Sequence, residues 1–225
     1  MVKKISILVL ALLLALVVIE KVVLRKKNTP YEFWRFNGVY KLDDDLIYSH
    51  KINSKRSWRF KDNDRTITEV VSINNLGLRD REFNKNEEFD KRILILGDSM
   101  TFGHGVNNDE TFPNQLESIF SENSVNVDVL NAGVKGYGTD HLYKFFISRL
   151  AKLTPDIVVL VIYNNDVSDN IILPLYTVKN GELEELDATK SWLYIIGRLK
   201  SITPSLIHDT NIFKFLGARI EQSYK

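Results

Sequence analysis

The sequence predicts an α/β fold with a three-layer parallel sheet, preceded by a membrane-anchoring helix and a small β-rich segment. The apolar run at 93–96 leads directly into Gly97-Asp98-Ser99. After Arg92, strand-like and helix-like patterns alternate, and each strand-like run ends in polar residues or glycines. Such alternation builds a parallel sheet with right-handed crossovers. Ligands bind beyond the carboxyl ends of its strands, so these clusters are expected at one edge.

The alternating part of the chain supplies three strands and two helices. Apolar runs predict strands at 93–96, 125–130 and 157–162, and periodic stretches predict helices at 111–120 and 139–150. Pro113 falls in the first turn of the first helix, where its missing N–H donor costs nothing. Later apolar stretches predict further helices at 192–199 and 211–220, without another βα unit.

The amino terminus carries an uninterrupted apolar run at 5–19. Extension to Leu24 reaches the span of about 20 residues, because Lys21 can snorkel to the interface. No small-x-small cleavage site follows, so residues 1–27 are expected to form a single-pass anchor. A cleaved signal peptide and a soluble core helix are the alternatives. The basic residues that follow the run outnumber Lys3 and Lys4, which favours a cytoplasmic domain by the positive-inside rule.

Residues 28–90 form a polar, turn-rich accessory segment. Short runs with β-type alternation lie at 38–42, 57–60 and 68–73, separated by turn sequences such as Asn37-Gly38. They predict a small antiparallel element. A charged stretch at 85–92 then leads into a domain expected at 91–225.

Composition excludes several classes of function. The 30 basic and 29 acidic residues give a net charge of +1, so there is no electrostatic case for nucleic acid. The absence of cysteine excludes disulfides and thiolate metal sites. The four histidines have no metal-ligand spacing, so no metal or other cofactor is expected.

Ser99 is the first candidate for chemistry. A serine on a tight turn after a buried strand has its hydroxyl at the carboxyl edge of the sheet. At the positive end of a helix, it would also lie where an oxyanion is stabilised. The alternative is a helix N-cap, a position that serine favours. Asp98 is expected to brace the turn through backbone hydrogen bonds.

Gly136 and Asn165 are the other candidates, each after a predicted strand. Gly136 allows its backbone N–H to approach a ligand closely, and Asn165 offers a side-chain amide. With the Ser99 N–H they would supply three donors to a tetrahedral oxyanion. The alternatives are an ordinary glycine-rich loop and an ordinary turn. Phosphate cradling is a rival, but no G-x-x-x-x-G-K pattern is present.

Together these residues resemble the SGNH, or GDSL-type, hydrolase family. Gly97-Asp98-Ser99 resembles its serine block, Asn131 with Gly136 its glycine block, and Asn165-Asp166 its asparagine block. The resemblance implies a flavodoxin-like sheet, Ser99 as nucleophile, and an oxyanion hole of Ser99, Gly136 and Asn165. Asp98 and Asp166 would be supporting residues. It also places the domain on the extracytoplasmic side, against the charge rule.

Two departures from the family pattern stand out. Tyr163 occupies the position where the asparagine block usually begins with glycine. The block Asp-x-x-His, which carries the base, is missing, because no aspartate lies three residues before His50, His104, His141 or His208. The family's sheet has about five strands and three are readable here. The chain is therefore expected to be cut short, with His104 and His141 as conceivable substitutes near the site.

The sequence thus predicts a hydrolase of ester bonds, an SGNH-type esterase or deacetylase, inactive in this form. Its expected partners are an ester-bearing small molecule, a glycan or a lipid, and the membrane through the amino-terminal helix. A non-catalytic module that binds an acyl or glycan group is the alternative. Flavin or nucleotide binding is a third interpretation, but no phosphate-binding loop follows Leu96.

Overall fold

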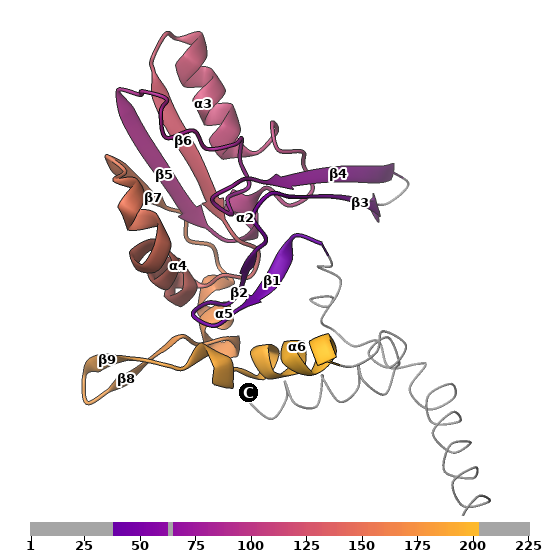
Figure 1. The fold of residues 1–225 in the computed structure, drawn as a ribbon, viewed down its shortest axis with the longest axis vertical. Coiled ribbons are helices and arrows are strands. Elements are labelled where there is room, and N and C mark those ends of the chain that lie inside the picture. The colour runs from indigo at the N-terminus through magenta and orange to yellow at the C-terminus, as the bar shows by residue number, and fades with distance from the viewer. Residues whose placement is uncertain (1–37, 63–64, 203–225) are drawn as a thin grey trace, which may run out of the picture. The chain divides into compact units, whose positions relative to one another are not determined.

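A computed structural model describes residues 38–62 and 65–202 (Figure 1). Residues 36–191 form one compact unit, whereas α6 (Trp192–Ile202) belongs to a second unit and is described by itself. The expected anchor at 1–27 and the predicted helix at 211–220 lie outside the described residues. Among the described helices, none is long and apolar enough to cross a membrane.

The three predicted strands form one parallel sheet in the order β6-β5-β7. β5 (Lys91–Gly97) lies in the middle, between β6 (Val127–Gly133) and β7 (Ile157–Leu160). Ile93 aligns with Val129 on one side and with Ile157 on the other. The predicted parallel sheet, with its first strand central, is therefore confirmed.

Burial on both faces of β5 explains its continuous apolar sequence. Its alternate side chains Ile93 and Ile95 pack with Val127 and Val129 of β6 in one cluster. The helix α3 (Phe112–Glu122) covers this cluster with Leu116 and Phe120. Leu94 and Leu96, on the opposite face, are buried as well. A strand covered on both faces needs no polar alternation.

The helices differ from the prediction in where they end, and one helix, α5 (Asp166–Ile172), was not predicted. α4 (Thr139–Phe145) starts where predicted, but residues 146–150 continue as a π-helical turn and 151–153 as a 3₁₀ turn. The prediction of one regular helix over 139–150 is wrong in its second half. α5 follows β7 closely, where the asparagines predicted only a turn.

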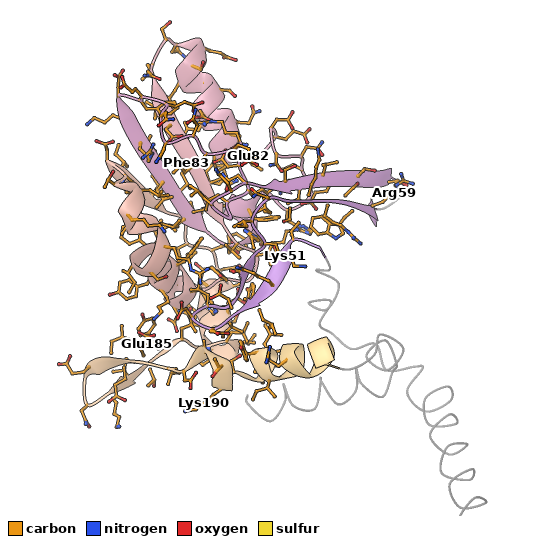
Figure 2. The ribbon with its side chains drawn as sticks, viewed as in Figure 1. Lys51, Arg59, Glu82, Phe83, Glu185 and Lys190 are labelled. Atoms are coloured by element: carbon orange, nitrogen blue, oxygen red, sulfur yellow. The ribbon has the colours of Figure 1, made fainter. Side chains whose placement is uncertain are left out.

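Two antiparallel hairpins confirm the predicted β-rich segment. They are β1 (Tyr40–Asp43) with β2 (Ile47–His50), and β3 (Ser54–Asp62) with β4 (Arg65–Ile73). Val39, Val71 and Ile73 form a buried cluster with Phe102, which follows Ser99 by three residues. The hairpins therefore pack against the serine turn, while Arg59 marks the far end of β3–β4 (Figure 2).

A third hairpin was not predicted. β8 (Tyr176–Lys179) pairs with β9 (Glu182–Glu185) around Asn180-Gly181, both of which have positive φ. Asn-Gly with two positive φ values is the signature of a type I′ hairpin turn. The charged strand Glu182–Glu185 has no apolar alternation that would have marked it.

The outer edge of β7 is open within the described residues. All four of its apolar side chains are between 38% and 48% exposed. The sequence shows no later βα unit that would add a strand at this edge. An exposed apolar edge strand is a known site of unwanted association.

Candidate active site

Ser99 is the first residue of α2 (Ser99–Phe102), a helix of a single turn. The N-cap is Asp98, whose Oδ1 accepts a hydrogen bond from the Met100 N–H at 2.8 Å. Asp98 therefore braces the turn as predicted, and the alternative of Ser99 as N-cap is wrong. Because α2 has only one turn, its dipole contributes less to oxyanion stabilisation than the predicted helix would.

Glycines make the tight serine turn feasible. A Cβ on Gly97 would lie 2.1 Å from Thr101 Oγ1, and one on Gly133 would lie 2.1 Å from the Phe102 nitrogen. Only glycine fits at these two points. The end of β6 therefore packs directly on the backbone of α2, which leaves Ser99 half-buried beside the next loop.

Asn165 and Ser99 meet at the carboxylate of Asp98. The Ser99 hydroxyl donates to Asp98 Oδ2 at 3.4 Å, and Asn165 Nδ2 donates to the same oxygen at 3.1 Å. Asn165 Nδ2 also donates to Asp169 Oδ2 at 2.6 Å. Since an amide nitrogen has two hydrogens, donation to a substrate oxygen requires one of these bonds to be exchanged.

Two further carboxylates surround Asn165. Asp166 is buried, and its Oδ2 accepts a hydrogen bond from the Tyr163 N–H at 3.1 Å, which braces the turn before α5. Burial raises the pKa of Asp166 and of Asp169, and the nearby Asp98 charge raises both further. Asp169 was missed at the sequence level. Its spacing of four from Asn165 on a helix was the available signal.

Gly136 lies in a turn that joins β6 to α4. Tyr137 N–H donates to the Val134 carbonyl at 3.2 Å, and Gly136 has a φ of 76°. Val134 N–H donates to the Gly97 carbonyl at 3.0 Å, which ties this turn to the residue before Asp98. The turn is therefore anchored beside the serine turn, as the oxyanion-hole interpretation requires.

His104 and Lys135 form a polar pair next to this turn. Lys135 Nζ lies 2.7 Å from His104 Nδ1 and 3.6 Å from Glu69 Oε1. Burial lowers the pKa of Lys135 to about 8, and burial and the Lys135 charge lower the pKa of His104. An ammonium group only donates, so His104 Nδ1 is the acceptor and the ring proton sits on Nε2.

None of the three described histidines contacts the Ser99 hydroxyl. His104 meets Ser99 only through its backbone N–H, which donates to the Ser99 carbonyl at 3.0 Å. His50 is buried with Nδ1 2.9 Å from the Gly77 carbonyl. His141 is fully buried and stacks on Tyr137 with ring centroids 4.7 Å apart. His208 lies outside the described residues.

His141 should make stability depend on pH. Burial lowers the pKa of His141 from 6.5 to about 3, and neither ring nitrogen has a partner in the described part of the chain. Only the unfolded chain protonates it between these values, so its contribution to stability is lost as pH falls below 6.5.

We expect His141→Phe to raise the free energy of unfolding at pH 7 by about 1 kcal/mol, because it removes two unsatisfied polar groups. The difference in the free energy of unfolding between the variant and the unmodified protein should grow by up to about 1.4 kcal/mol per pH unit below 6. Urea unfolding at pH 7, 6 and 5 measures both effects. Parallel pH dependences in the two proteins would show that His141 is protonated in the folded state.

A buried arginine fixes the far end of the serine helix. Arg79 is fully buried and donates to the carbonyls of Phe102 at 2.9 Å and Gly103 at 2.6 Å. It reaches the Val106 carbonyl at 2.5 Å, and Glu69 Oε1 lies 3.2 Å away as its countercharge. The carbonyls left unpaired at the end of α2 are thus satisfied by Arg79, which follows the β3–β4 hairpin.

Comparison with known proteins places the chain in a family. The family model described as "GDSL-like Lipase/Acylhydrolase family" matches residues 95–207, half of the chain. The chain belongs to this family. At the level of the family, its chemistry is ester hydrolysis. The resemblance carried by the three sequence blocks is confirmed.

Two solved structures are similar to this GDSL-like protein. They are AlinE4, described as an SGNH-hydrolase family esterase, and a mutant of the same esterase. Each has 18% identity and a TM-score of 0.33, over 62% of this chain and 75% of that chain. A search of curated proteins gave no match.

Tyr163, the departure in the asparagine block, has a φ outside the left-handed region, so no glycine is needed there.

Proposed function

We propose that this GDSL-like protein is a serine ester hydrolase in which Ser99 is the nucleophile. The observation that carries the proposal is the convergence of the Ser99 hydroxyl and the Asn165 amide on one oxygen of Asp98. The Gly136 turn, tied to Gly97, supplies the third group. Acetylated glycans, lipid esters and small esters are the proposed substrates.

The proposed reaction proceeds through an acyl-enzyme. Ser99 Oγ attacks the ester carbonyl carbon while its proton passes to a base, and the carbonyl electron pair moves onto oxygen. The Ser99 and Gly136 N–H groups and the Asn165 amide stabilise that oxyanion. Collapse expels the alcohol, which takes up the proton, and water then releases the acid from Ser99.

The base is the part that the described residues do not supply. The Ser99 hydroxyl donates to Asp98 at 3.4 Å, and the Asp98 side chain is already occupied as the N-cap. A serine without a base is a weak nucleophile. We therefore propose that this chain has very low turnover. We also propose that it acts at a membrane, with its domain on the extracytoplasmic side.

External imidazole tests the proposal. In serine hydrolases, loss of the serine costs little once the histidine is gone, so Ser99→Ala alone is a weak test without a base. With imidazole supplied, hydrolysis of p-nitrophenyl acetate should rise at least about tenfold above the imidazole background, since general base catalysis contributes about 10²–10⁴ when positioned.

Two variants show whether the stimulation depends on Ser99. Ser99→Ala should abolish the stimulation, and Ser118→Ala, which changes an exposed serine on α3, should keep it. Equal stimulation in all three proteins would refute the Ser99 nucleophile. No stimulation in any of them, together with tight binding of an acetylated oligosaccharide, would favour the non-catalytic acyl- or glycan-binding module.

A further inference from the structure

The β1–β2 hairpin contacts the Lys135–Gly136 peptide through the hydroxyl of Tyr48. Tyr48, on β2, is buried, and its hydroxyl donates to the Lys135 carbonyl at 2.8 Å, across 87 positions of sequence. That carbonyl belongs to the same peptide unit as the Gly136 N–H. Because the peptide is planar and trans, its C=O and N–H point in opposite directions. Whatever fixes the Lys135 carbonyl therefore also aims the Gly136 N–H.

The Lys135–Gly136 peptide is the central peptide of a β-turn, and its orientation differs between turn types. Val134 to Tyr137 form a turn closed by the Tyr137 N–H on the Val134 carbonyl, and Gly136 at its third position has a φ of 76°. Positive φ at the third position is the mark of a type II turn. Type I and type II turns differ by about half a rotation of their central peptide, here Lys135–Gly136. The wrong turn type would aim the Gly136 N–H away from the site.

The backbone before Tyr48 is strained, and two contacts hold the residue in place. Ile47 has a φ of 64°, and the Tyr48 N–H bonds the Leu46 carbonyl at 2.6 Å across it. A β-branched residue in this conformation stores strain that the surrounding structure must sustain. The Tyr137 hydroxyl donates back to the Tyr48 carbonyl at 2.6 Å, and the two rings pack 5.2 Å apart.

We propose that Tyr48 is a positioning residue for the oxyanion hole. Its hydroxyl selects the type II form of the Val134–Tyr137 turn and thereby directs the Gly136 N–H towards the oxyanion. By accepting a hydrogen bond, the Lys135 carbonyl also polarises its peptide, which makes the Gly136 N–H a stronger donor. This inference rests on the proposed function of Ser99, and it gives the hairpin segment a role in the reaction.

Tyr48→Phe tests the proposal, with Tyr137→Phe as a matched control. Each variant removes one buried tyrosine hydroxyl that donates to a buried backbone carbonyl, but only Tyr48 bonds the Lys135–Gly136 peptide. In the imidazole-supported assay, Tyr48→Phe should lower kcat at least about tenfold with KM nearly unchanged, as for loss of an oxyanion donor. Tyr137→Phe should lower kcat by less than Tyr48→Phe does, since the hydrogen bond from the Tyr48 hydroxyl to the Lys135 carbonyl remains.

A second readout separates positioning from folding. Phenylboronic acid forms a tetrahedral adduct with an active serine, so Tyr48→Phe should weaken its affinity more than Tyr137→Phe does. If Tyr48→Phe fails to fold, Tyr48→4-aminophenylalanine keeps an N–H donor and should retain kcat. Equal kcat losses in the two phenylalanine variants, or none in either, would overturn the role of Tyr48. Stimulation that survives Ser99→Ala would instead overturn the proposed function, and this inference with it.

Discussion

Replacing Asn165 with alanine should lower imidazole-supported hydrolysis by about 10²-fold, the usual cost of one oxyanion-hole donor. The Asn165 amide lies on the same Asp98 oxygen as the Ser99 hydroxyl, so it is the side-chain donor placed to reach a tetrahedral oxygen on Ser99. The variant also leaves Asp98 and Asp169 without their shared amide. Repulsion between these carboxylates adds to the loss.

The neighbouring residue provides the control for this prediction. Asn164 is exposed and lies in the same turn, so Asn164→Ala changes the same chemical group one position away. It should keep the stimulated rate within about twofold, because it removes no oxyanion donor. Steady-state kinetics on p-nitrophenyl acetate measure both variants. Similar rates in the two variants would mean that Asn165 braces the turn and does not donate to substrate.

The largest loss of stability is expected for Arg79→Met. The substitution removes the donor to the Phe102, Gly103 and Val106 carbonyls and leaves Glu69 buried without its closest countercharge. Breaking a buried ion pair by removing one partner costs about 3–5 kcal/mol. Urea unfolding followed by circular dichroism should show this decrease in the free energy of unfolding.

An exposed arginine serves as the reference for that measurement. Arg59 is exposed at the far end of the β3–β4 hairpin (Figure 2), and Arg59→Met should change the free energy of unfolding by less than about 0.5 kcal/mol. A loss below about 1 kcal/mol for Arg79→Met would show that water replaces the guanidinium, and that Arg79 does not hold the serine helix.

Local patterns predicted the sheet and the serine turn because both depend on neighbouring residues. The run at 93–96 and the Gly97-Asp98-Ser99 turn fix a buried strand and a tight connection within a few positions. The same holds for the antiparallel pairing of β3 and β4. Even the role of Asp98 as a brace follows from its hydrogen bond two residues along the chain.

Contacts between distant parts of the chain explain what the sequence did not predict. Tyr48 meets Lys135 across 87 positions, and Arg79 meets Gly103 across 24. No local periodicity encodes such pairs. The interpretation of 28–90 as an accessory segment therefore missed that Tyr48 and Arg79 hold the loops around Ser99. The α5 helix was missed because asparagine and aspartate favour turns when considered alone.

Locating the acyl group tests the central claim most directly. After reaction with p-nitrophenyl acetate in imidazole and rapid acid quenching, mass spectrometry of peptides should find one acetyl group on Ser99. Ser99→Ala should carry none, and Ser118→Ala should be labelled like the unmodified protein. Acetylation confined to lysines, or hydrolysis stimulated by imidazole without any acetyl-Ser99, would contradict the assignment of Ser99 as the nucleophile.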